Sequence, residues 1–373
     1  MTPATSVPVP SELVARYRRS SSGRAWLASL PGLIAGRMEQ WNLASALLPG
    51  ALPWSGHGAV VVPVLREDGT PAALKVAYPH DEAIGEPHAL ALWAGRGAVG
   101  LLERDGQTCS MLLERLEAGA SLNDVPVDEA AAVWGGLVRQ LSLVPDARPE
   151  WSSFEHIAAR AEQWSDEFPA DWNQLGRPFP RWLLEAALEV CQTRGAVGRR
   201  SARDVLVHAD LHFLNILARP GTGRPGNIQP SGRYVAIDPQ PLVGEAEFAV
   251  APLLWNRLYD LPADGPEAAL RRRCADFSTA AGLDPEAARQ WALTREVANA
   301  LWYAAEPHHQ GDLARSLWVA STLAGRTLPG RPPAGSLPEP GRTVGPERFT
   351  EWPVLLPGRR QLASAPARPR GRI

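Results

Sequence analysis

Residues 205–217 read Val-Leu-Val-His-Ala-Asp-Leu-His-Phe-Leu-Asn-Ile-Leu. Apolar residues stand at both ends of this stretch, and the polar residues between them are His208, Asp210, His212 and Asn215. Short apolar runs bounded by a polar turn are typical of buried strands. The stretch therefore predicts a strand, a loop and a second strand, with the polar side chains held at the mouth of a sheet.

The spacing of these polar residues indicates a chemistry. The aspartate lies two residues after a histidine and five residues before an asparagine, which is the pattern H-x-D-x-x-x-x-N of kinase-like catalytic loops. In such loops the aspartate orients a hydroxyl group and accepts its proton, and the asparagine coordinates a magnesium ion that bridges nucleotide phosphates. The same residue types also occur in solvated turns, so the motif alone leaves a plain polar loop open.

A second carboxylate follows at the end of the next apolar run, Arg233-Tyr-Val-Ala-Ile-Asp238. In kinase-like enzymes the main metal ligand is an aspartate at the end of a strand, and a hairpin joins that strand to the first loop. The connection from Arg219 to Gly232 is long and rich in Gly and Pro. It predicts a surface insertion, because lengthening a surface loop adds little closure entropy.

Lys75 lies inside the short apolar run Pro71-Ala-Ala-Leu-Lys-Val-Ala77 and is the only lysine in the sequence. All other basic residues are arginine, so this position keeps a compact ammonium where the rest of the chain uses a planar guanidinium. In kinase-like enzymes a strand lysine of this kind holds nucleotide phosphates and pairs with a helix glutamate. The alternative is a lysine retained by chance on a solvated strand edge.

Together these stretches resemble the aminoglycoside phosphotransferase family of the kinase-like fold, and in particular its streptomycin 6-kinase and hydroxyurea phosphotransferase branch. The resemblance covers about residues 50–325. The stretches that carry it are Ala73–Val76, Glu86–Trp93, Gly95–Leu102, Leu112–Gly119, His208–His212, Ala236–Gly244 and Ala251–Arg257. The last two of these are the most specific to the branch.

The resemblance implies phosphoryl transfer from ATP, with Mg²⁺, to a hydroxyl of a small cationic, aminoglycoside-like substrate. The roles that it implies are a catalytic Asp210, the metal ligands Asn215 and Asp238, and the nucleotide-binding residues Lys75, Glu86, Glu114 and Leu116. Glu114 and Leu116 belong to the expected hinge, where backbone groups read adenine. Glu82 is the rival of Glu86 as partner of the lysine, and the turn 56–58 either covers the phosphates or is simply a turn.

The expected fold is α+β and two-lobed, with a mixed β-sheet N-lobe over residues 1–117 and a mainly helical C-lobe over 118–325. Helical periodicity indicates helices at 25–30, 33–43 and 246–261, among others. Residues 326–373 are rich in Pro, Gly and Arg, and they predict a disordered tail.

Charge and composition narrow the class of partner. The net charge is −2, and nine arginines and three glutamates in the tail leave the remaining body at −8. An acidic body favours a cationic substrate over nucleic acid. The longest uncharged stretch, residues 40–65, is broken by prolines and glycines, so no membrane span is expected. Three scattered cysteines and the absence of a signal-peptide pattern at the N-terminus favour the cytoplasm.

The sequence departs from the branch pattern near the loop. Ala209 stands where glycine is usual, Phe213 and Leu214 are bulky, Gln240 replaces a common lysine, and Ala249 replaces a common acid. These departures keep open a non-catalytic nucleotide-binding module, and equally a kinase of hydroxyurea or another metabolite. A metal-dependent phosphohydrolase using the histidines as ligands is a further alternative. The acceptor is expected to meet C-lobe carboxylates, for which Asp260, Asp264, Glu296 and Glu306 are the candidates.

Overall fold

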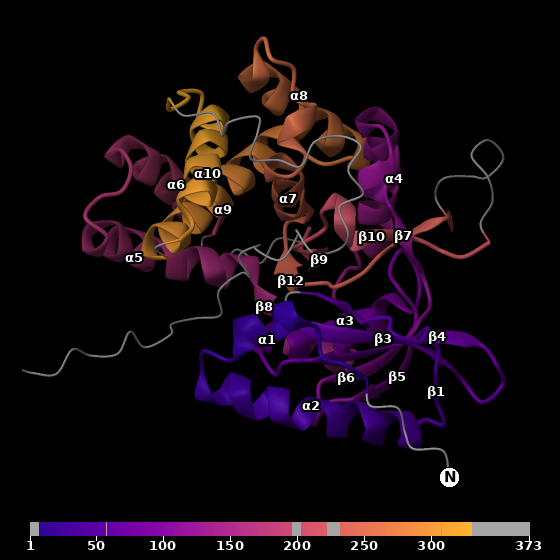
Figure 1. Ribbon diagram of the computed structural model, residues 1–373. Coiled ribbons are helices and arrows are strands. Elements are labelled where there is room, and N and C mark those ends of the chain that lie inside the picture. Colours follow the sequence, from indigo (N-terminus) through magenta and orange to yellow (C-terminus); the bar gives the residue numbers. More distant parts are fainter. Residues whose placement is uncertain (1–6, 57, 196–202, 222–231, 307, 330–373) are drawn as a thin grey trace, which may run out of the picture.

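The computed structural model describes residues 7–56, 58–195, 203–221, 232–306 and 308–329. Figure 1 shows two lobes, with the strands and helices of the N-terminal part below and the helices of the C-terminal part above. The two-lobed α+β fold predicted from the sequence is therefore confirmed. Most of the predicted tail, from residue 330 onward, lies outside the described residues, as does most of the expected insertion between 219 and 232.

The lower lobe is built on a six-stranded sheet in the order β1-β3-β4-β6-β5, with β2 paired to β3, and every pairing in it is antiparallel. Gly69, with φ of +81°, lies in the hairpin turn between β3 and β4, and this conformation favours glycine. The strands are β1 Ala44–Ser45, β2 Trp54–Ser55, β3 Ala59–Leu65, β4 Pro71–Ala77, β5 Leu101–Asp105 and β6 Ser110–Glu114.

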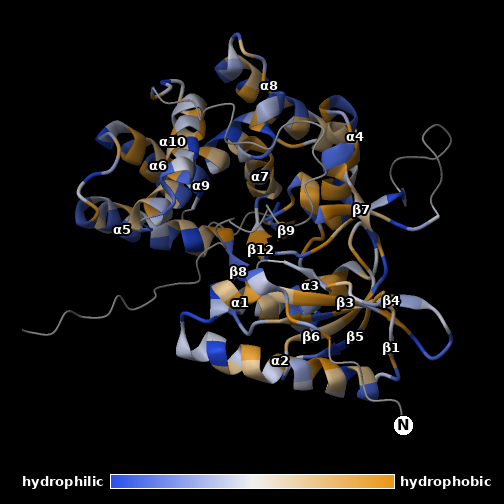
Figure 2. Ribbon diagram, in the orientation of Figure 1, coloured by the Kyte–Doolittle hydropathy of each residue, from blue (hydrophilic) through white to orange (hydrophobic). Residues whose placement is uncertain are grey.

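One face of this sheet is covered by α1 (Ser11–Tyr17) and α2 (Ser21–Gln40). Two helices were predicted at 25–30 and 33–43, and this was wrong, because α2 continues through Pro31. Its buried side chains Trp26, Leu30 and Ile34 recur every four residues and pack on the valines of β3. Figure 2 shows β3 as hydrophobic along its length, and α2 as mixed. Burial of this stripe outweighs the helix-breaking effect of the proline.

Helix α3 (Asp81–Trp93) joins the two lobes. Trp93, at its C-terminal end, donates its indole N–H to the carbonyl of Leu141 at 2.8 Å and stacks on His208 with ring centroids 6.1 Å apart. Residues 97–99 then pair with Ala236, since Val99 N–H donates to the Ala236 carbonyl and Ala236 N–H to the Gly97 carbonyl. The helix is thereby fixed against the strand that leads to Asp238.

The upper lobe combines two small sheets with packed helices. The sheets run β11-β10-β7 and β8-β12-β9. Their strands are β7 Glu117–Ser121, β8 Glu155–His156, β9 Val205–His208, β10 Ile216–Ala218, β11 Tyr234–Ala236 and β12 Pro241–Gly244. The helices are α4 Val127–Leu141, α5 Ile157–Gln174, α6 Arg181–Arg194, α7 Ala251–Trp255, α8 Pro266–Ala281, α9 Pro285–Ala305 and α10 Gln310–Leu323. Short 3₁₀ segments are η1 Leu122–Asp124, η2 Pro149–Ser153, η3 Phe213–Asn215, η5 Ala246–Val250 and η6 Leu258–Asp260.

The single helix predicted over 246–261 was also wrong. The chain forms η5, the short helix α7 and η6, and Arg257 has a left-handed φ of +51°. That conformation interrupts a helix. It also places the Arg257 guanidinium 4.9 Å from the centre of the Phe213 ring, where it donates to the Val125 carbonyl at 2.7 Å. Tertiary contacts with Phe213 and Val125 thus replace the regular helix that the periodicity indicated.

Candidate active site

The predicted strand–loop–strand is present as β9, η3 and β10. His208, the last residue of β9, is buried, its Nε2 lies 3.0 Å from the Ile237 carbonyl, and its Nδ1 accepts the Asp210 N–H. Burial lowers the pKa of His208 to about 4, so the ring is neutral. Because backbone groups occupy both ring nitrogens, this histidine shapes the loop and joins it to the strand before Asp238.

Asp210 and Asn215 are brought together by the turn between them. The Asn215 amide donates to the Asp210 carbonyl at 2.9 Å and to its Oδ2 at 3.1 Å. His212 Nε2 lies 3.6 Å from the same Oδ2, and burial lowers the pKa of His212 to about 3. Burial also raises the pKa of Asp210 to about 7. The carboxyl group is therefore held in one position, largely away from water.

Asp238 follows β11, and its φ of +53° is left-handed. A non-glycine residue in this region carries backbone strain, which proteins retain where a side chain has to be aimed. The Asp238 side chain is 49% exposed and its Oδ1 lies 2.6 Å from Lys75 Nζ. The lysine lowers the pKa of Asp238, so the carboxylate is ionised. Asp238 is thus a half-exposed carboxylate of the upper lobe that is paired with a lysine of the lower lobe.

Lys75 on β4 connects the lower lobe to this carboxylate. Its Nζ lies 2.6 Å from both carboxyl oxygens of Glu86 on α3 and 2.6 Å from Asp238. Burial disfavours the charged amine, but the two carboxylates outweigh it and raise the pKa of Lys75. Burial raises the pKa of Glu86 to about 7. Glu86 is thus the partner seen here, and the side chain of its rival Glu82 lies outside the described part of the chain.

The glycine turn before β3 lies against Asp238. A Cβ added at Gly56 would be 3.9 Å from Asp238 Oδ2. The turn is also tied to α1, because Arg16 donates to the Gly56 carbonyl at 3.5 Å. His57 lies outside the described residues. The turn is therefore close enough to border a ligand at Asp238.

At the expected hinge, a second ion pair besides that of Lys75 joins Glu114 to Arg219. The Glu114 carboxylate, at the end of β6, accepts from Arg219 at 2.9 Å and from the Gly100 N–H at 3.0 Å. Arg219 follows β10, so the pair joins the two lobes beside the hinge. Leu116 is buried, and Arg115 between them lies 4.4 Å over the Trp54 ring. The Glu114 side chain is thus occupied, which leaves backbone groups for any nucleotide contact at the hinge.

Sequence reasoning missed Arg295 on α9. This arginine is 3% exposed, and its charge acts on Asp210 to lower the pKa of that carboxyl against the effect of burial. A signal was available, because Arg295 lies four residues after Trp291, a spacing that puts both on one face of a helix.

The four candidate acceptor carboxylates differ in exposure. Glu296 is fully buried, so it is unavailable to a substrate. Asp260, Asp264 and Glu306 are exposed, and Asp260 is also paired with Arg257 at 2.6 Å.

A strand lysine paired with a helix glutamate, opposite a loop aspartate and asparagine and a strand-end aspartate, is the arrangement of a kinase-like phosphotransferase. The chain belongs to the aminoglycoside/hydroxyurea antibiotic resistance kinase family, whose model matches residues 44–306. Within the described residues, no helix is long and apolar enough to span a membrane.

Curated relatives cover most of the chain. It is 35% identical to the streptomycin 6-kinase of Streptomyces glaucescens over 81% of this chain and 92% of the relative. It is 36% identical to the hydroxyurea phosphotransferase of Kitasatospora aureofaciens over 86% of this chain and 87% of the relative. Among solved structures, amicoumacin kinase in complex with AMP-PNP and Ca²⁺ matches with a TM-score of 0.50 at 14% identity, over 86% of this chain and 97% of that one. At this identity the match shows the fold alone.

Proposed function

We propose that this protein transfers the γ-phosphoryl group of ATP to a hydroxyl of a streptomycin-like aminoglycoside. The observation that carries the proposal is the contact of Lys75 with both Glu86 and Asp238 across the two lobes, beside the loop of Asp210 and Asn215. A charge arrangement of this kind suits a triphosphate, and the two curated relatives supply the class of acceptor.

On the donor side, Lys75 holds the phosphates and Glu86 fixes the direction of its amine. The ammonium is compact, buried and charged, which suits a phosphate ligand. Gly56 borders the same space, and its missing side chain leaves room for the phosphate groups beside Asp238. The backbone of Glu114 and Leu116 is assigned to adenine, since the Glu114 side chain is taken by Arg219.

The side chains of Asn215 and Asp238 suit Mg²⁺ as a ligand. Asp238 offers a half-exposed ionised carboxylate, and the amide nitrogen of Asn215 is committed to Asp210, which leaves its amide oxygen as a ligand. Oxygen ligands of this kind, few in number and next to phosphates, are what Mg²⁺ prefers. When bound, the ion would neutralise charge on the phosphates. Asn215 and Asp238 are therefore the proposed metal ligands.

On the acceptor side, Asp210 holds the hydroxyl and accepts its proton. Its position is fixed by Asn215, and burial raises its pKa to about 7, which suits a group that takes a proton near neutral pH. Positioning supplies most of the rate in this chemistry, because the enzyme has little covalent work to do.

The test is ATP turnover with defined acceptors. Purified protein is incubated with Mg-ATP and either streptomycin, hydroxyurea or buffer, ADP release is followed, and each acceptor is weighed by mass spectrometry. We expect acceptor-dependent ADP release and a gain of one phosphoryl group on streptomycin. Turnover with hydroxyurea alone would instead indicate a hydroxyurea phosphotransferase. No turnover with either compound would refute the proposed acceptor class.

Nucleotide binding is tested separately, using the single lysine. A lysine-reactive acyl phosphate of ATP has only Lys75 and the N-terminal amine to label. We expect labelling of Lys75 that excess Mg-ATP suppresses, with the N-terminal amine as an internal control. Labelling without any turnover would favour the non-catalytic nucleotide-binding module.

The phosphohydrolase alternative is less well supported. His208 has both ring nitrogens on backbone groups, and His212 Nδ1 accepts the Leu214 N–H. In the part of the chain that the structure describes, no group of three or more His, Cys, Asp or Glu side chains is arranged to hold a metal. That hypothesis also gives no role to the pairing of Lys75 with Glu86.

A further inference from the structure

Two glycines, Gly56 and Gly58, lie at the point where the chain passes Asp238 and enters β3. The Gly56 N–H donates to the Ala59 carbonyl at 3.0 Å, and a Cβ added at Gly56 would be 3.9 Å from Asp238 Oδ2. Glycine has more conformational freedom than any other residue, so holding these two in one conformation costs entropy. Other parts of the molecule therefore have to fix their position beside the carboxylate.

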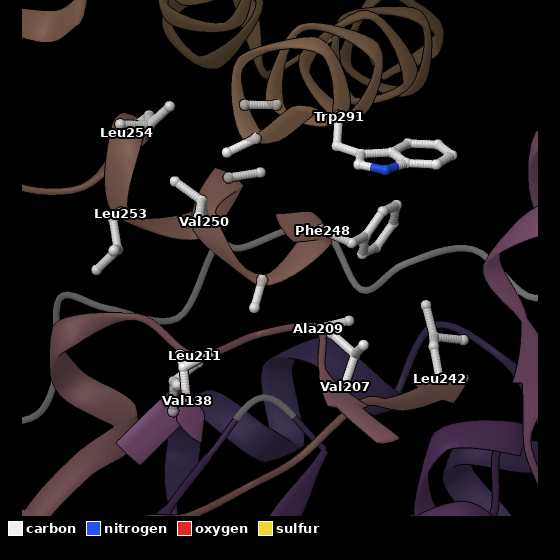
Figure 3. Packing of buried hydrophobic residues seen from close by; sticks show 14 of the residues in the cluster. Val138, Val207, Ala209, Leu211, Leu242, Phe248, Val250, Leu253, Leu254 and Trp291 are labelled. Carbon is white, nitrogen blue, oxygen red and sulfur yellow. The ribbon is translucent and has the colours of Figure 1, made fainter. Parts of the chain in front are cut away.

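The loop that carries Asp210 is fixed by the hydrophobic core. Figure 3 shows Ala209 and Leu211, the two neighbours of Asp210, packed among hydrophobic side chains of the upper lobe. Both are fully buried, so side chains on either side of the carboxylate hold this loop in place. Gly56 and Gly58 have no side chains that could be buried in this way.

Helix α1 contacts both glycines. Figure 1 shows this helix at the upper edge of the lower lobe, towards the other lobe. Arg16 donates to the Gly56 carbonyl at 3.5 Å. The Tyr17 hydroxyl lies 3.1 Å from the position that a Cβ on Gly58 would occupy, and the Gly58 carbonyl accepts the Tyr78 N–H at 2.7 Å. Two consecutive side chains of one helix thus reach both glycines.

Helix α1 is itself held by the sheet that carries Lys75. Leu13 is fully buried in one cluster with the valines of β3 and β4. The centre of the Tyr17 ring lies 5.0 Å from that of Trp26 on α2 and 4.6 Å from that of Tyr78, which directly follows β4. Aromatic rings at these distances favour a defined relative orientation. The same sheet therefore sets the position of Lys75 and of the last two residues of α1.

We propose that α1 is a positioning element of the donor site, in which Arg16 and Tyr17 hold Gly56 and Gly58 in the conformation that receives the phosphates of ATP. The helix lies before residues 44–306, which the family model matches, so these contacts extend the donor site beyond the motif residues. The inference rests on the proposed function, because it adds residues to the donor side of the same site.

The expected effect of α1 is on nucleotide affinity. A turn that is already held before the nucleotide arrives loses less conformational entropy when the nucleotide binds, which strengthens binding. Arg16 and Tyr17 do not contact the acceptor loop of Asp210 in the described chain. Their loss should therefore weaken binding of Mg-ATP and change the transfer step much less.

The experiment removes one contact at a time in the full-length protein. Arg16→Met removes the guanidinium that reaches the Gly56 carbonyl, and Arg16→Lys keeps a charged donor. Tyr17→Phe removes only the hydroxyl that faces Gly58 and keeps the ring for packing. Each variant is characterised by the dissociation constant of Mg-ATP from suppression of Lys75 labelling, by kcat and KM for ATP and acceptor, and by urea unfolding.

Two controls remove the same kinds of group from the start of α2. Arg24→Met removes a guanidinium that donates to the carbonyls of residues 18 and 19 at 3.0 and 3.5 Å. Ser22→Ala removes a hydroxyl that accepts from the Tyr78 hydroxyl at 2.9 Å. Within the described residues, neither side chain forms a hydrogen bond with Gly56 or Gly58. Both controls should keep the wild-type affinity for Mg-ATP.

We expect Arg16→Met and Tyr17→Phe each to raise the dissociation constant of Mg-ATP about 2- to 10-fold, the factor that corresponds to the net contribution of one hydrogen bond. At saturating ATP, kcat and the KM for acceptor should stay within about twofold of wild type. Arg16→Lys should recover part of the affinity, because it keeps a charged donor.

Gly58→Ala tests the contact with Tyr17 directly. The added methyl group would lie 3.1 Å from the Tyr17 hydroxyl and 3.2 Å from His80 Nε2, so its neighbours or the turn have to shift. This variant should therefore also bind Mg-ATP more weakly. In the double variant with Tyr17→Phe the hydroxyl is gone, so the loss of affinity should be smaller than the product of the two single losses. Residues in contact are coupled in this way, whereas independent sites are additive in free energy.

Wild-type affinity for Mg-ATP in both Arg16→Met and Tyr17→Phe, or losses no larger than those of the two controls, would overturn the positioning role. Losses that simply multiply in the Gly58→Ala, Tyr17→Phe variant would show that Tyr17 does not act on Gly58. If Arg16→Met does not fold, Arg16→Lys and Tyr17→Phe decide the question by the same comparison. Failure of Mg-ATP to protect Lys75 in the wild-type protein would instead count against the proposed function itself, so the two failures are distinguishable.

Discussion

Substitution of Lys75 by methionine tests separately how much the lysine stabilises the fold and how much it contributes to phosphoryl transfer. In the folded protein its Nζ contacts three carboxylate oxygens at 2.6 Å, two of Glu86 and one of Asp238. Methionine has a similar length and no charge. The variant therefore removes the cation and leaves both acids in place.

The expected loss of stability arises mainly from Glu86. The Asp238 side chain is 49% exposed and regains water, so its isolated charge has a small effect. Glu86 is only 3% exposed, and removing one partner of a buried ion pair destabilises a protein by about 3–5 kcal/mol. Burial already raises the pKa of Glu86 to about 7, and without the amine this pKa rises further.

The pH dependence follows from that pKa. A carboxyl group whose pKa is raised on folding stabilises the fold while it is protonated, and the contribution is lost as pH rises through the folded value. In the variant this loss extends to higher pH than in wild type. The difference in unfolding free energy between the two proteins should therefore grow above about pH 7 and shrink below it.

The assay is urea unfolding, followed by tryptophan fluorescence near pH 6 and pH 8.5, for Lys75→Met, Glu86→Gln and the double variant. The double variant lacks the orphaned charge and should regain most of the stability at the higher pH. Transfer to the acceptor should stay about 10²–10³-fold below wild type in both variants that lack the lysine, since a charged donor to the phosphates is gone.

Two results would refute this reasoning. A stability loss that is the same at both pH values would mean that Glu86 is not the source of the cost. Recovery of phosphoryl transfer in the double variant would mean that the lysine serves the fold alone.

Three further predictions concern single groups. Asp210→Asn should lower turnover at least about 10²-fold and keep Mg-ATP binding in a fluorescence titration; unchanged turnover would point to a different base. Asp238→Asn should weaken the Mg²⁺-dependent part of ATP binding, measured by titrating Mg²⁺ at fixed ATP, and equal Mg²⁺ dependence would remove Asp238 from the metal site. Burial raises the pKa of Glu296 from 4.5 to about 7, so wild type loses stability as pH rises through this interval, by a total on the order of 3 kcal/mol. Glu86 and Asp210, whose pKa values burial also raises to about 7, add to the same slope. Glu296→Gln should therefore reduce the slope in urea unfolding by its own share and be the more stable protein at pH 8.5, and a slope equal to that of wild type would contradict the assignment.

Several elements could be predicted because their signals are local. The strand, loop and strand around Asp210 follow from apolar runs bounded by polar residues, and Gly69 marks the hairpin before Lys75. The length of α2 could not be predicted from its sequence. Its proline indicates a break, and only the burial of Trp26, Leu30 and Ile34 against the sheet favours one continuous helix.

The residues of the site likewise divide into those that a local sequence signal marks and those that only the packing reveals. Motif spacing singled out Asp210 and Asn215, and the uniqueness of Lys75 among the basic residues marked it for a special role. Arg295 gave a weaker signal, its place four residues after Trp291, and its contact with Phe248 depends on how α9 packs over η5. Similarly, Glu296 was a reasonable acceptor residue until its complete burial excluded it.

The sequence by itself determined the residue types of the loop 208–215, the presence of a single lysine and the two-lobed class of fold, since each depends on neighbours along the chain. Only the tertiary structure decided which groups meet. Lys75 and Asp238 are 163 residues apart, and Glu114 and Arg219 are 105 apart. Contacts at such separations are set by the packing of whole elements, and burial then fixes the charge state of each group through desolvation, which no local pattern records.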